Sequence, residues 1–268
     1  MLHLSGLYRY PMKSAAGEAL SEAMLDDLGV QGDRRWMAVD AETGRFLTQR
    51  LLPSMTQLNV RWQGHAYIVL SAPGMDELQV AVPDEWAPLR PVTIWRDNPQ
   101  VPDAGDAAAQ WLSCWLKRPC RLVYISAERA RQIDTAYAQP GERVAFADGF
   151  PLLLIGQASL EDLSVRVGRA LSMLRFRPNL VVNGSAAYAE DGWSRIRIGG
   201  VEFRVVKGCS RCIMTTLDPL TGERSEDREP LTSLRRYRER DGEVYFGQNL
   251  IACGGGRLAL DMPVEVLA

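Results

Sequence analysis

The 268-residue sequence predicts an α+β fold that is mainly β-sheet. Short strand-like segments fill the chain up to Trp95, separated by Gly, Pro and Asp turn signals at the spacing of a β-barrel or sandwich. Only a few segments carry the apolar period of a helix, and the second half of the chain mixes both periods. The length allows one large domain or two modest ones.

The strands expected in the first half have apolar or β-branched residues at alternating or consecutive positions. They cover residues 4–10, 36–40, 46–49, 58–62, 67–71, 78–82 and 92–95. The turn residues between the second and third of these strands include Gly44, which tolerates positive φ. We therefore expect a hairpin between residues 36–40 and 46–49.

A helix is expected over residues 106–117, where Ala108, Trp111, Leu112 and Trp115 form an apolar stripe and Asp106 is the N-cap. A strand over residues 120–125 and a charged loop over residues 126–143 follow. The loop is the best candidate for a domain junction. We therefore predict one domain over residues 1–125 and a second over residues 126–268.

In the second half, a helix is expected over residues 159–171, with Ser159 and Asp162 as its capping box. Gly199-Gly200 predicts a tight hairpin. Pro230 is expected as the first residue of a short helix that runs to Tyr237. The expected strands are residues 179–183, 195–198, 201–206, 244–253, 258–260 and 264–267.

The composition narrows the function classes. The formal net charge is −2, from 31 Lys and Arg against 33 Asp and Glu, so the chain lacks the basic surplus of a nucleic-acid or anionic-membrane binder. Five cysteines are an odd set and too few for a disulfide framework, which favours a reducing compartment. The sequence shows neither a signal peptide nor a spanning segment, so we expect a cytoplasmic protein.

The sharpest local motif is Cys209-Ser210-Arg211-Cys212, a C-x-x-C sequence placed after one expected strand and before another. A cationic neighbour favours the thiolate, which is the form that attacks or ligates a metal. Three interpretations remain open: half of a zinc site without a second Cys or His pair, a thioredoxin-like dithiol without its βαβ context, and two cysteines packed as small apolar residues.

Three further segments offer cations before or after strands. Lys13 and Ser14 follow a strand that Pro11 ends, and a lysine beside a hydroxyl is a reasonable phosphate contact. The other two segments contain the pairs Arg34-Arg35 and Arg175–Arg177. Each segment alone is typical of surface charge, and together they offer a convergent anion pocket. The sequence has no P-loop, dinucleotide fingerprint, zinc-protease helix or nucleophile elbow.

The string from Cys209 to Gly222 closely resembles the signature of MOSC-domain proteins, in the branch of the mitochondrial amidoxime reducing component and its bacterial relatives that reduce N-hydroxylated bases. Nearly the whole chain shares in the resemblance. The other matching motifs, in the family's order, are Tyr10-Pro11-Met12-Lys13-Ser14, Gly32-Asp33-Arg34-Arg35-Trp36, Phe46-Leu47-Thr48-Gln49-Arg50, Phe176-Arg177-Pro178-Asn179 and Phe246-Gly247-Gln248-Asn249.

This resemblance implies an N-terminal MOSC-type β-barrel region followed by a MOSC β-barrel domain with a few helices, and a molybdenum–molybdopterin cofactor held between them. By carry-over from the family, Cys212 is the metal ligand and the catalytic residue. The cofactor-binding residues implied in the same way are Lys13, Ser14, Arg34, Gly149, Phe150, Arg177, Ser210, Arg211 and Asn249. Asn249 stands where the mitochondrial branch has a Tyr.

The implied activity is the reduction of amidoximes, hydroxylamines and N-hydroxylated bases. The chain lacks a C-x₄-C-x₂-C run, so we expect no iron–sulfur cluster and electrons from a separate flavin or iron–sulfur reductase. The partners expected are that reductase and a small N-hydroxylated substrate, with no nucleic acid and no membrane. The alternative is a sulfur or cofactor carrier, because MOSC domains also resemble the C-terminal part of molybdenum cofactor sulfurase.

Overall fold

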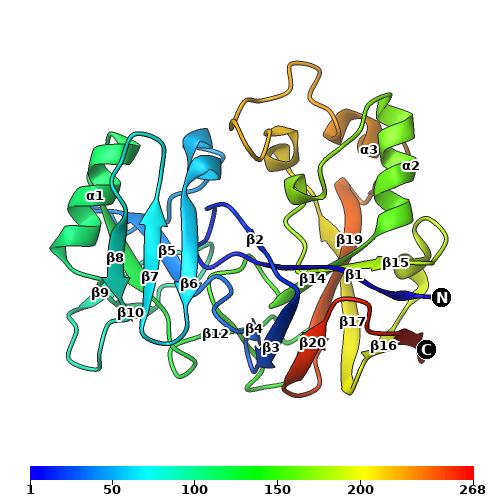
Figure 1. Cartoon of the computed structure of the whole chain (residues 1–268), viewed down its shortest axis with the longest axis horizontal. Coiled ribbons are helices and arrows are strands. Elements are labelled where there is room, and N and C mark those ends of the chain that lie inside the picture. Colours follow the sequence, from blue (N-terminus) through cyan, green and yellow to red (C-terminus); the bar gives the residue numbers. More distant parts are fainter.

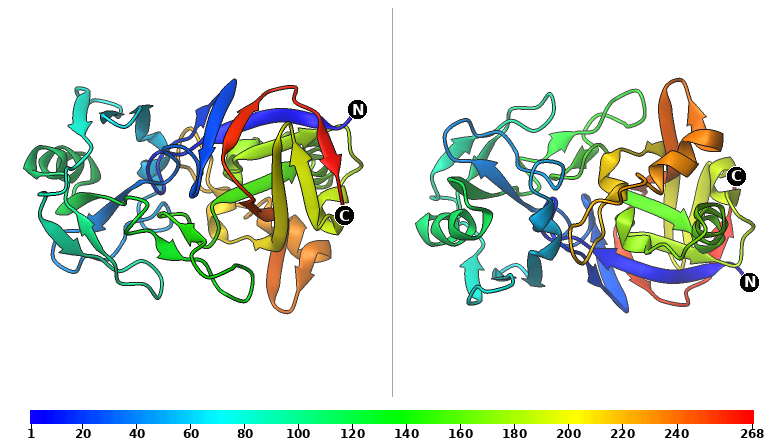
Figure 2. Two further views of the ribbon diagram at one scale, coloured as in Figure 1. Left: turned by 90° about the horizontal axis from the view of Figure 1, so that it is seen from below. Right: turned by 90° about the horizontal axis from the view of Figure 1, so that it is seen from above.

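A computed structural model describes residues 1–268 and confirms the α+β, mainly β fold (Figure 1). The chain forms two lobes that lie side by side along its longest axis (Figure 2). We call residues 36–125 the first lobe. The second lobe, built from the strands before residue 36 and after residue 150, is called the barrel. The three helices are α1 (Asp106–Leu116) in the first lobe, and α2 (Gln157–Val167) and α3 (Leu231–Arg238) beside the barrel.

The barrel is a nine-stranded sheet in the order β2-β1-β15-β14-β19-β17-β16-β21, with β18 paired to β19. A bridge between His3 and Pro263 brings the last strand back to the first, which closes the sheet. Its strands are β1 (His3–Arg9), β2 (Glu18–Ala19), β14 (Leu152–Gly156), β15 (Leu180–Asn183), β16 (Arg195–Ile198), β17 (Val201–Ser210), β18 (Glu239–Arg240), β19 (Glu243–Ala252) and β21 (Val264–Val266).

The N-terminal residues pair with the C-terminal half of the chain. β1 is antiparallel to β15, and β3 (Glu22–Asp26) pairs with both β4 (Gly29–Val30) and β20 (Gly256–Ala259). A core cluster inside the barrel joins Leu4 and Leu7 to apolar residues of the second half. The domain division after residue 125 stays a prediction.

The first lobe packs small sheets and α1 around two core clusters. Trp36, Leu112 and Leu122 are fully buried in a core cluster of this lobe. Its strands are β5 (Trp36–Asp40), β6 (Asn59–Gln63), β7 (Tyr67–Ser71), β8 (Leu78–Ala81), β9 (Leu89–Pro91), β10 (Gln100–Pro102) and β11 (Cys120–Tyr124). A short hairpin, β12 (Arg131–Gln132) with β13 (Arg143–Val144), lies within and after the polar loop.

Two expected strands of the first lobe are wrong. Residues 46–49 and 92–95 form only isolated bridges, Val39 with Phe46, Arg45 with Thr93, and Ile94 with Asp97. Apolar side chains at these positions are buried without a continuous ladder, because their backbones turn within a few residues. The apolar pattern here correctly predicted which side chains are buried, but it did not predict that the backbone forms no strand.

Both expected helix caps are also wrong. Gly105 is the N-cap of α1, and Asp106 is already helical, with its carboxylate 2.7 Å from a guanidinium nitrogen of Arg121. α2 begins two residues earlier than expected and ends at Val167, four residues before the expected end, with Gly168 as its left-handed C-cap. Ser159 is inside this helix, and its hydroxyl donates to the buried carboxylate of Glu190 at 2.7 Å.

β14 was not predicted from the sequence. It is a barrel strand whose first residues line the site cavity. Leu152–Gly156 is buried at every position, parallel to β15 and antiparallel to β19. A strand covered on both faces has a continuous apolar run instead of an alternating one. Pro151 before the run and Gly156 after it were the available signals.

Candidate functional site

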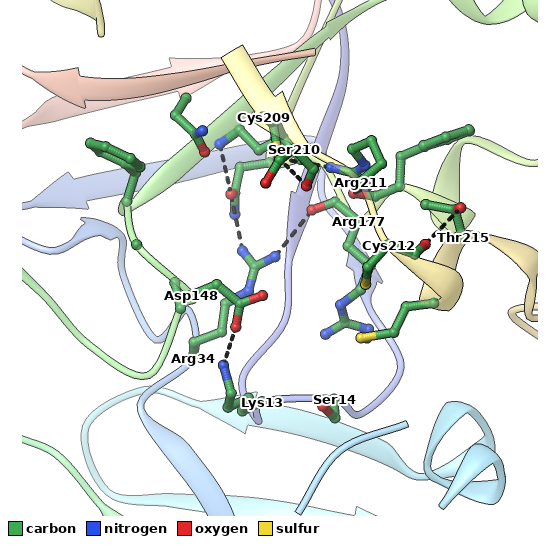
Figure 3. Close-up of a pocket in the computed structure, with 18 of the residues that line it drawn as sticks. Lys13, Ser14, Arg34, Asp148, Arg177, Cys209, Ser210, Arg211, Cys212 and Thr215 are labelled. Atoms are coloured by element: carbon green, nitrogen blue, oxygen red, sulfur yellow. Dashed lines mark hydrogen bonds and ion pairs between the residues drawn. The ribbon is translucent and has the colours of Figure 1, made fainter. Parts of the chain in front are cut away.

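One cavity between the first lobe and the barrel contains every residue that the sequence analysis assigned to the site (Figure 3). The segments just after β1 and just before β5 supply one side, and the end of β17 supplies the other. The ten assigned residues in the cavity wall are Lys13, Ser14, Arg34, Gly149, Phe150, Arg177, Ser210, Arg211, Cys212 and Asn249.

Cys212 presents an exposed thiol at this cavity. β17 ends at Ser210, and Cys212 is the N-cap of a 3₁₀ helix over Ile213–Thr216, where a further strand was expected. The carbonyl of Cys212 accepts from both the amide and the hydroxyl of Thr215, at 3.1 Å each. These bonds hold the backbone while the sulfur stays free to meet a ligand.

Cys209 differs from Cys212 in its surroundings. It is half-buried against a core cluster of the barrel, and its sulfur lies 2.9 Å from a guanidinium nitrogen of Arg211. No group of three or more His, Cys, Asp or Glu side chains is arranged to hold a metal ion. The protein alone therefore does not complete a zinc site at the C-x-x-C motif.

Three site residues have left-handed backbones. The φ angles of Ser14, Arg34 and Arg177 are 64°, 45° and 56°. Non-glycine residues avoid this region, and such strain concentrates at active sites and ligand clamps, where surrounding structure enforces it. The backbone amide of Arg34 donates to the carbonyl of Tyr10, which fixes this turn beside the cavity.

The aromatic ring of Tyr10 contacts two arginine side chains. The guanidinium groups of Arg34 and Arg177 each lie 4.3 Å from its ring centroid. Arg34 is fully held: it donates to Asp33 at 2.7 Å and to the side chain of Asn179 and the carbonyl of Arg177 at 3.0 Å each. The aromatic ring thus stabilises two neighbouring positive charges.

Arg177 has no carboxylate partner. One of its terminal nitrogens donates to the carbonyl of Ala15 at 2.6 Å, and the other, Nη2, is buried without a partner. Burial and the nearby charge of Arg34 lower the pKa of Arg177 to about 10, so it remains a cation at neutral pH. An anion placed beside it would relieve both the repulsion and the missing hydrogen bond.

Lys13 lies at the cavity in an ion pair, in which the lysine is buried and the carboxylate of Asp148 is exposed. Its ammonium group, on a residue only 6% exposed, donates to the carbonyl of Phe146 at 2.8 Å and to the carboxylate of Asp148. Burial lowers the pKa of Lys13 although Asp148 opposes this. Desolvation alone would raise the pKa of Asp148, but Lys13 and Arg50 outweigh it and hold that pKa low.

The cavity is strongly cationic. Six cations line it, and Asp148 is its only carboxylate; the cations are Lys13, Arg34, Arg50, Arg175, Arg177 and Arg211. Buried nitrogens without a partner include Nε of Arg50, Nη2 of Arg177 and Nε of Arg211. Unpaired buried donors are costly, so their gathering here indicates a site built for an anionic group that accepts several hydrogen bonds.

The remaining assigned residues contribute less specific contacts. Asn249, on β19, directs its amide to the carbonyl of Gly208 at the long distance of 3.5 Å. A side chain at Gly149 would meet no atom within 4 Å, so the backbone there is open to the cavity. Phe150 packs edge-on against Tyr137, with centroids 5.9 Å apart. Ser210 is exposed at the end of its strand.

The sequence analysis missed several residues of this wall. Asp148 and Asn179 contact assigned residues, and Arg50 lies in the same wall. Asn179 and Arg50 belong to motifs quoted for the family resemblance. Asp148 had no local signal, since its partner Lys13 is 135 residues away. Conversely, Arg35 turns away from the cavity and makes two hydrogen bonds with the carboxylate of Asp26.

Comparison with known proteins places this geometry in a family. The MOSC N-terminal beta barrel domain matches residues 1–119, and the MOSC domain matches residues 141–265. The chain belongs to the MOSC-domain family. Mitochondrial amidoxime-reducing component 1 of Mus musculus is 34% identical to this MOSC protein over 97% of this chain and 81% of its own length. The Homo sapiens protein of the same name is 33% identical over 97% and 82%.

A second kind of relative matches most of the chain. The molybdenum cofactor sulfurase of Oryza sativa is 30% identical over 92% of this MOSC protein, which spans 32% of the sulfurase. The names of both relatives connect the family with molybdenum or with amidoxime reduction, and they indicate a molybdenum-related enzyme. No helix here is long and apolar enough to cross a membrane. Because two relatives are named as mitochondrial, the cytoplasmic location stays a prediction.

Proposed function

We propose that this protein reduces N-hydroxylated compounds such as amidoximes, hydroxylamines and N-hydroxylated bases. In this reaction the N–O bond breaks, and two electrons and two protons convert the hydroxylated nitrogen to an amine or amidine plus water. The observation that carries the proposal is the exposed Cys212 thiol in a cation-lined cavity, in a chain whose relatives are named for amidoxime reduction.

The cavity residues fit a molybdenum–molybdopterin cofactor. When bound, this group would supply two-electron oxygen-atom transfer at a metal with soft sulfur ligands. Cys212 would provide the protein thiolate. Ser14, Arg177 and Arg211 have free donors for the phosphate and the polar rim of the pterin, and Lys13 adds charge.

Other assigned residues would hold the cofactor in place. Arg34 is committed to Asp33 and Asn179, so its role would be to position Arg177 and add positive potential. Gly149 would offer an accessible backbone, while Phe150, Ser210 and Asn249 would complete the wall. The residues at the cavity thus bind and orient, and no second side chain is assigned as acid or base.

Electrons would come from a separate flavin or iron–sulfur reductase. The sequence offers no dinucleotide or flavin fingerprint. Docking of such a donor is expected to be transient and small in area, as electron-transfer encounters are. The other partner is the small N-hydroxylated substrate, and we assign neither nucleic acid nor membrane as a partner.

The test is turnover of the protein purified from a host that makes the cofactor. With reduced viologen, benzamidoxime should be converted to benzamidine, and with NADH alone it should not. Turnover with NADH alone would refute the external donor. Bound molybdenum without turnover of any N-hydroxylated compound would refute the reductase.

The sulfurase relative keeps a carrier function as the second candidate. In that case Cys212 or Cys209 would hold a persulfide, or Cys212 would pass the cofactor on. Mass spectrometry of the untreated protein separates the two candidates. A persulfide adduct of about 32 Da on a metal-free chain would favour the carrier, and an unmodified chain with molybdenum favours the reductase.

A further inference from the structure

A second cavity adjoins the first and shares three lining residues with it. Arg175, Arg177 and Met214 line both cavities, and Met214 follows Cys212 by two residues. The second cavity has a volume of about 260 Å³, below the roughly 300–1,000 Å³ of sites for drug-sized ligands. It is therefore suited to a small organic molecule that reaches toward Cys212.

One wall of this cavity is polar and incompletely hydrogen-bonded. The hydroxyl of Tyr10, a residue only 1% exposed, has no partner in the protein. Gln49, also buried, donates its amide to the carbonyl of Ser14 at 2.8 Å, while its own side-chain oxygen accepts no hydrogen bond from the chain. Burial raises the pKa of Tyr10, so its hydroxyl stays protonated and can donate.

Another part of the lining is apolar. It is made by Leu174, Met214, Leu217, Pro219 and Leu220. Leu220 is 75% exposed, in the turn between Leu217 and Arg224. A large exposed aliphatic side chain at the edge of a cavity provides contact area for a hydrocarbon or aromatic body that enters it.

We propose that this second cavity holds the organic part of the substrate, with Tyr10 and Gln49 facing its polar group and the apolar wall facing its hydrocarbon part. The amino group of an amidoxime donates to the side-chain oxygen of Gln49 and to the hydroxyl oxygen of Tyr10, which leaves its N–O group for the reacting centre in the first cavity. Single-ring aryl amidoximes would thus be preferred over hydroxylamine, which cannot reach the apolar wall. This inference rests on the proposed function, since the first cavity must hold the reacting centre.

The experiment compares two substrates in matched variants. Tyr10→Phe removes only the hydroxyl, and Leu220→Glu places a charge at the apolar edge. Each should lower the ratio of kcat/KM for benzamidoxime to kcat/KM for hydroxylamine by about tenfold, because the cavity binds only the former. The controls are Tyr8→Phe, on β1 two residues before Tyr10, and Val165→Glu, on α2 with 81% exposure. Their ratios should stay within about twofold of wild type.

A direct binding measurement gives a second readout. Calorimetric titration of benzamidoxime into the protein as isolated should show about tenfold weaker binding to Tyr10→Phe than to Tyr8→Phe. Tyr10→Phe should also unfold at a higher temperature than wild type, since it loses an unpaired buried hydroxyl, so misfolding cannot mimic the effect.

The possible failures are distinguishable. If wild type turns over both substrates and all four variants keep its ratio and its benzamidoxime affinity, the second cavity is not the substrate site and the reductase stands. If the molybdenum-loaded protein reduces neither substrate, the reductase fails. The titration then decides on the cavity alone, and equal affinity of Tyr10→Phe and Tyr8→Phe would overturn it.

Discussion

Replacing Arg177 by methionine should leave the cofactor-free protein about as stable as wild type. The pKa of Arg177 falls from its ordinary 12.5 to about 10, because burial and then Arg34 disfavour its charge. That difference corresponds to roughly 3 kcal/mol of destabilisation at neutral pH. It persists below about pH 10 and disappears as the pH rises toward 12.5, since the unfolded chain binds the extra proton in between.

Arg177→Met removes this destabilising charge, but it also loses the favourable contacts of Arg177, and the two effects offset each other. Its hydrogen bond to Ala15 contributes about 0.5–1.5 kcal/mol, and its stacking on Tyr10 contributes about 0.5–2 kcal/mol. Methionine keeps much of the side-chain volume, so the net change should lie within about 2 kcal/mol of zero. Arg34→Met is the contrasting variant. It leaves the buried carboxylate of Asp33 unpaired and should cost about 3–5 kcal/mol.

Urea unfolding of the three cofactor-free proteins measures these differences, with the midpoints compared at a common slope. Inorganic phosphate should raise the midpoint of wild type and have little effect on Arg177→Met, because only the former offers the unpaired cation. A loss in Arg177→Met as large as in Arg34→Met would show that Arg177 serves the fold, and the argument for an anion site there would be wrong.

Two further outcomes are expected. Cys209→Ser should keep most of the bound molybdenum and the viologen-dependent activity, because Cys209 packs against the core while Cys212 is exposed; a complete loss in metal analysis would point to a dithiol site. Asp40→Asn should flatten the acid unfolding curve, followed by circular dichroism, between about pH 4 and pH 2. In the wild type, hydrogen bonds from the amide of Thr43 and from Arg118 lower the pKa of Asp40 to about 2. Their stabilising effect is lost as the pH falls through that window. An unchanged curve would refute this assignment.

Local patterns predicted elements that have a clear local signal. β5 and β7 have the expected bounds, because each has its apolar residues in a short run between turn residues. The Gly199-Gly200 turn also joins β16 and β17 as expected. The capping box at Ser159 failed because the carboxylate that receives its hydroxyl belongs to Glu190, 31 residues away. Long-range partners of this kind leave no trace in the local pattern.

The residue types of the site could be predicted from the sequence, but their hydrogen bonds and ion pairs could not. The cations were visible in sequence, and the family resemblance gathered them around Cys212. The sequence did not show which of these cations lack a carboxylate partner. Arg34 and Arg177 look equivalent in the sequence, yet Arg34 is paired with Asp33 and Arg177 has no carboxylate partner. That difference arises from the fold, since the two meet over Tyr10 from segments far apart in the chain.

The central claim is that Cys212 holds a molybdenum cofactor in the first cavity. The most direct measurement is the molybdenum and pterin content per chain, by elemental analysis and pterin fluorescence, of wild type and Cys212→Ser made in the same cofactor-producing host. The account predicts about one molybdenum and one pterin per wild-type chain and loss of the metal in Cys212→Ser, because an alcohol is a poor ligand for a soft metal site. Wild type without molybdenum, or equal molybdenum in both proteins, would contradict it.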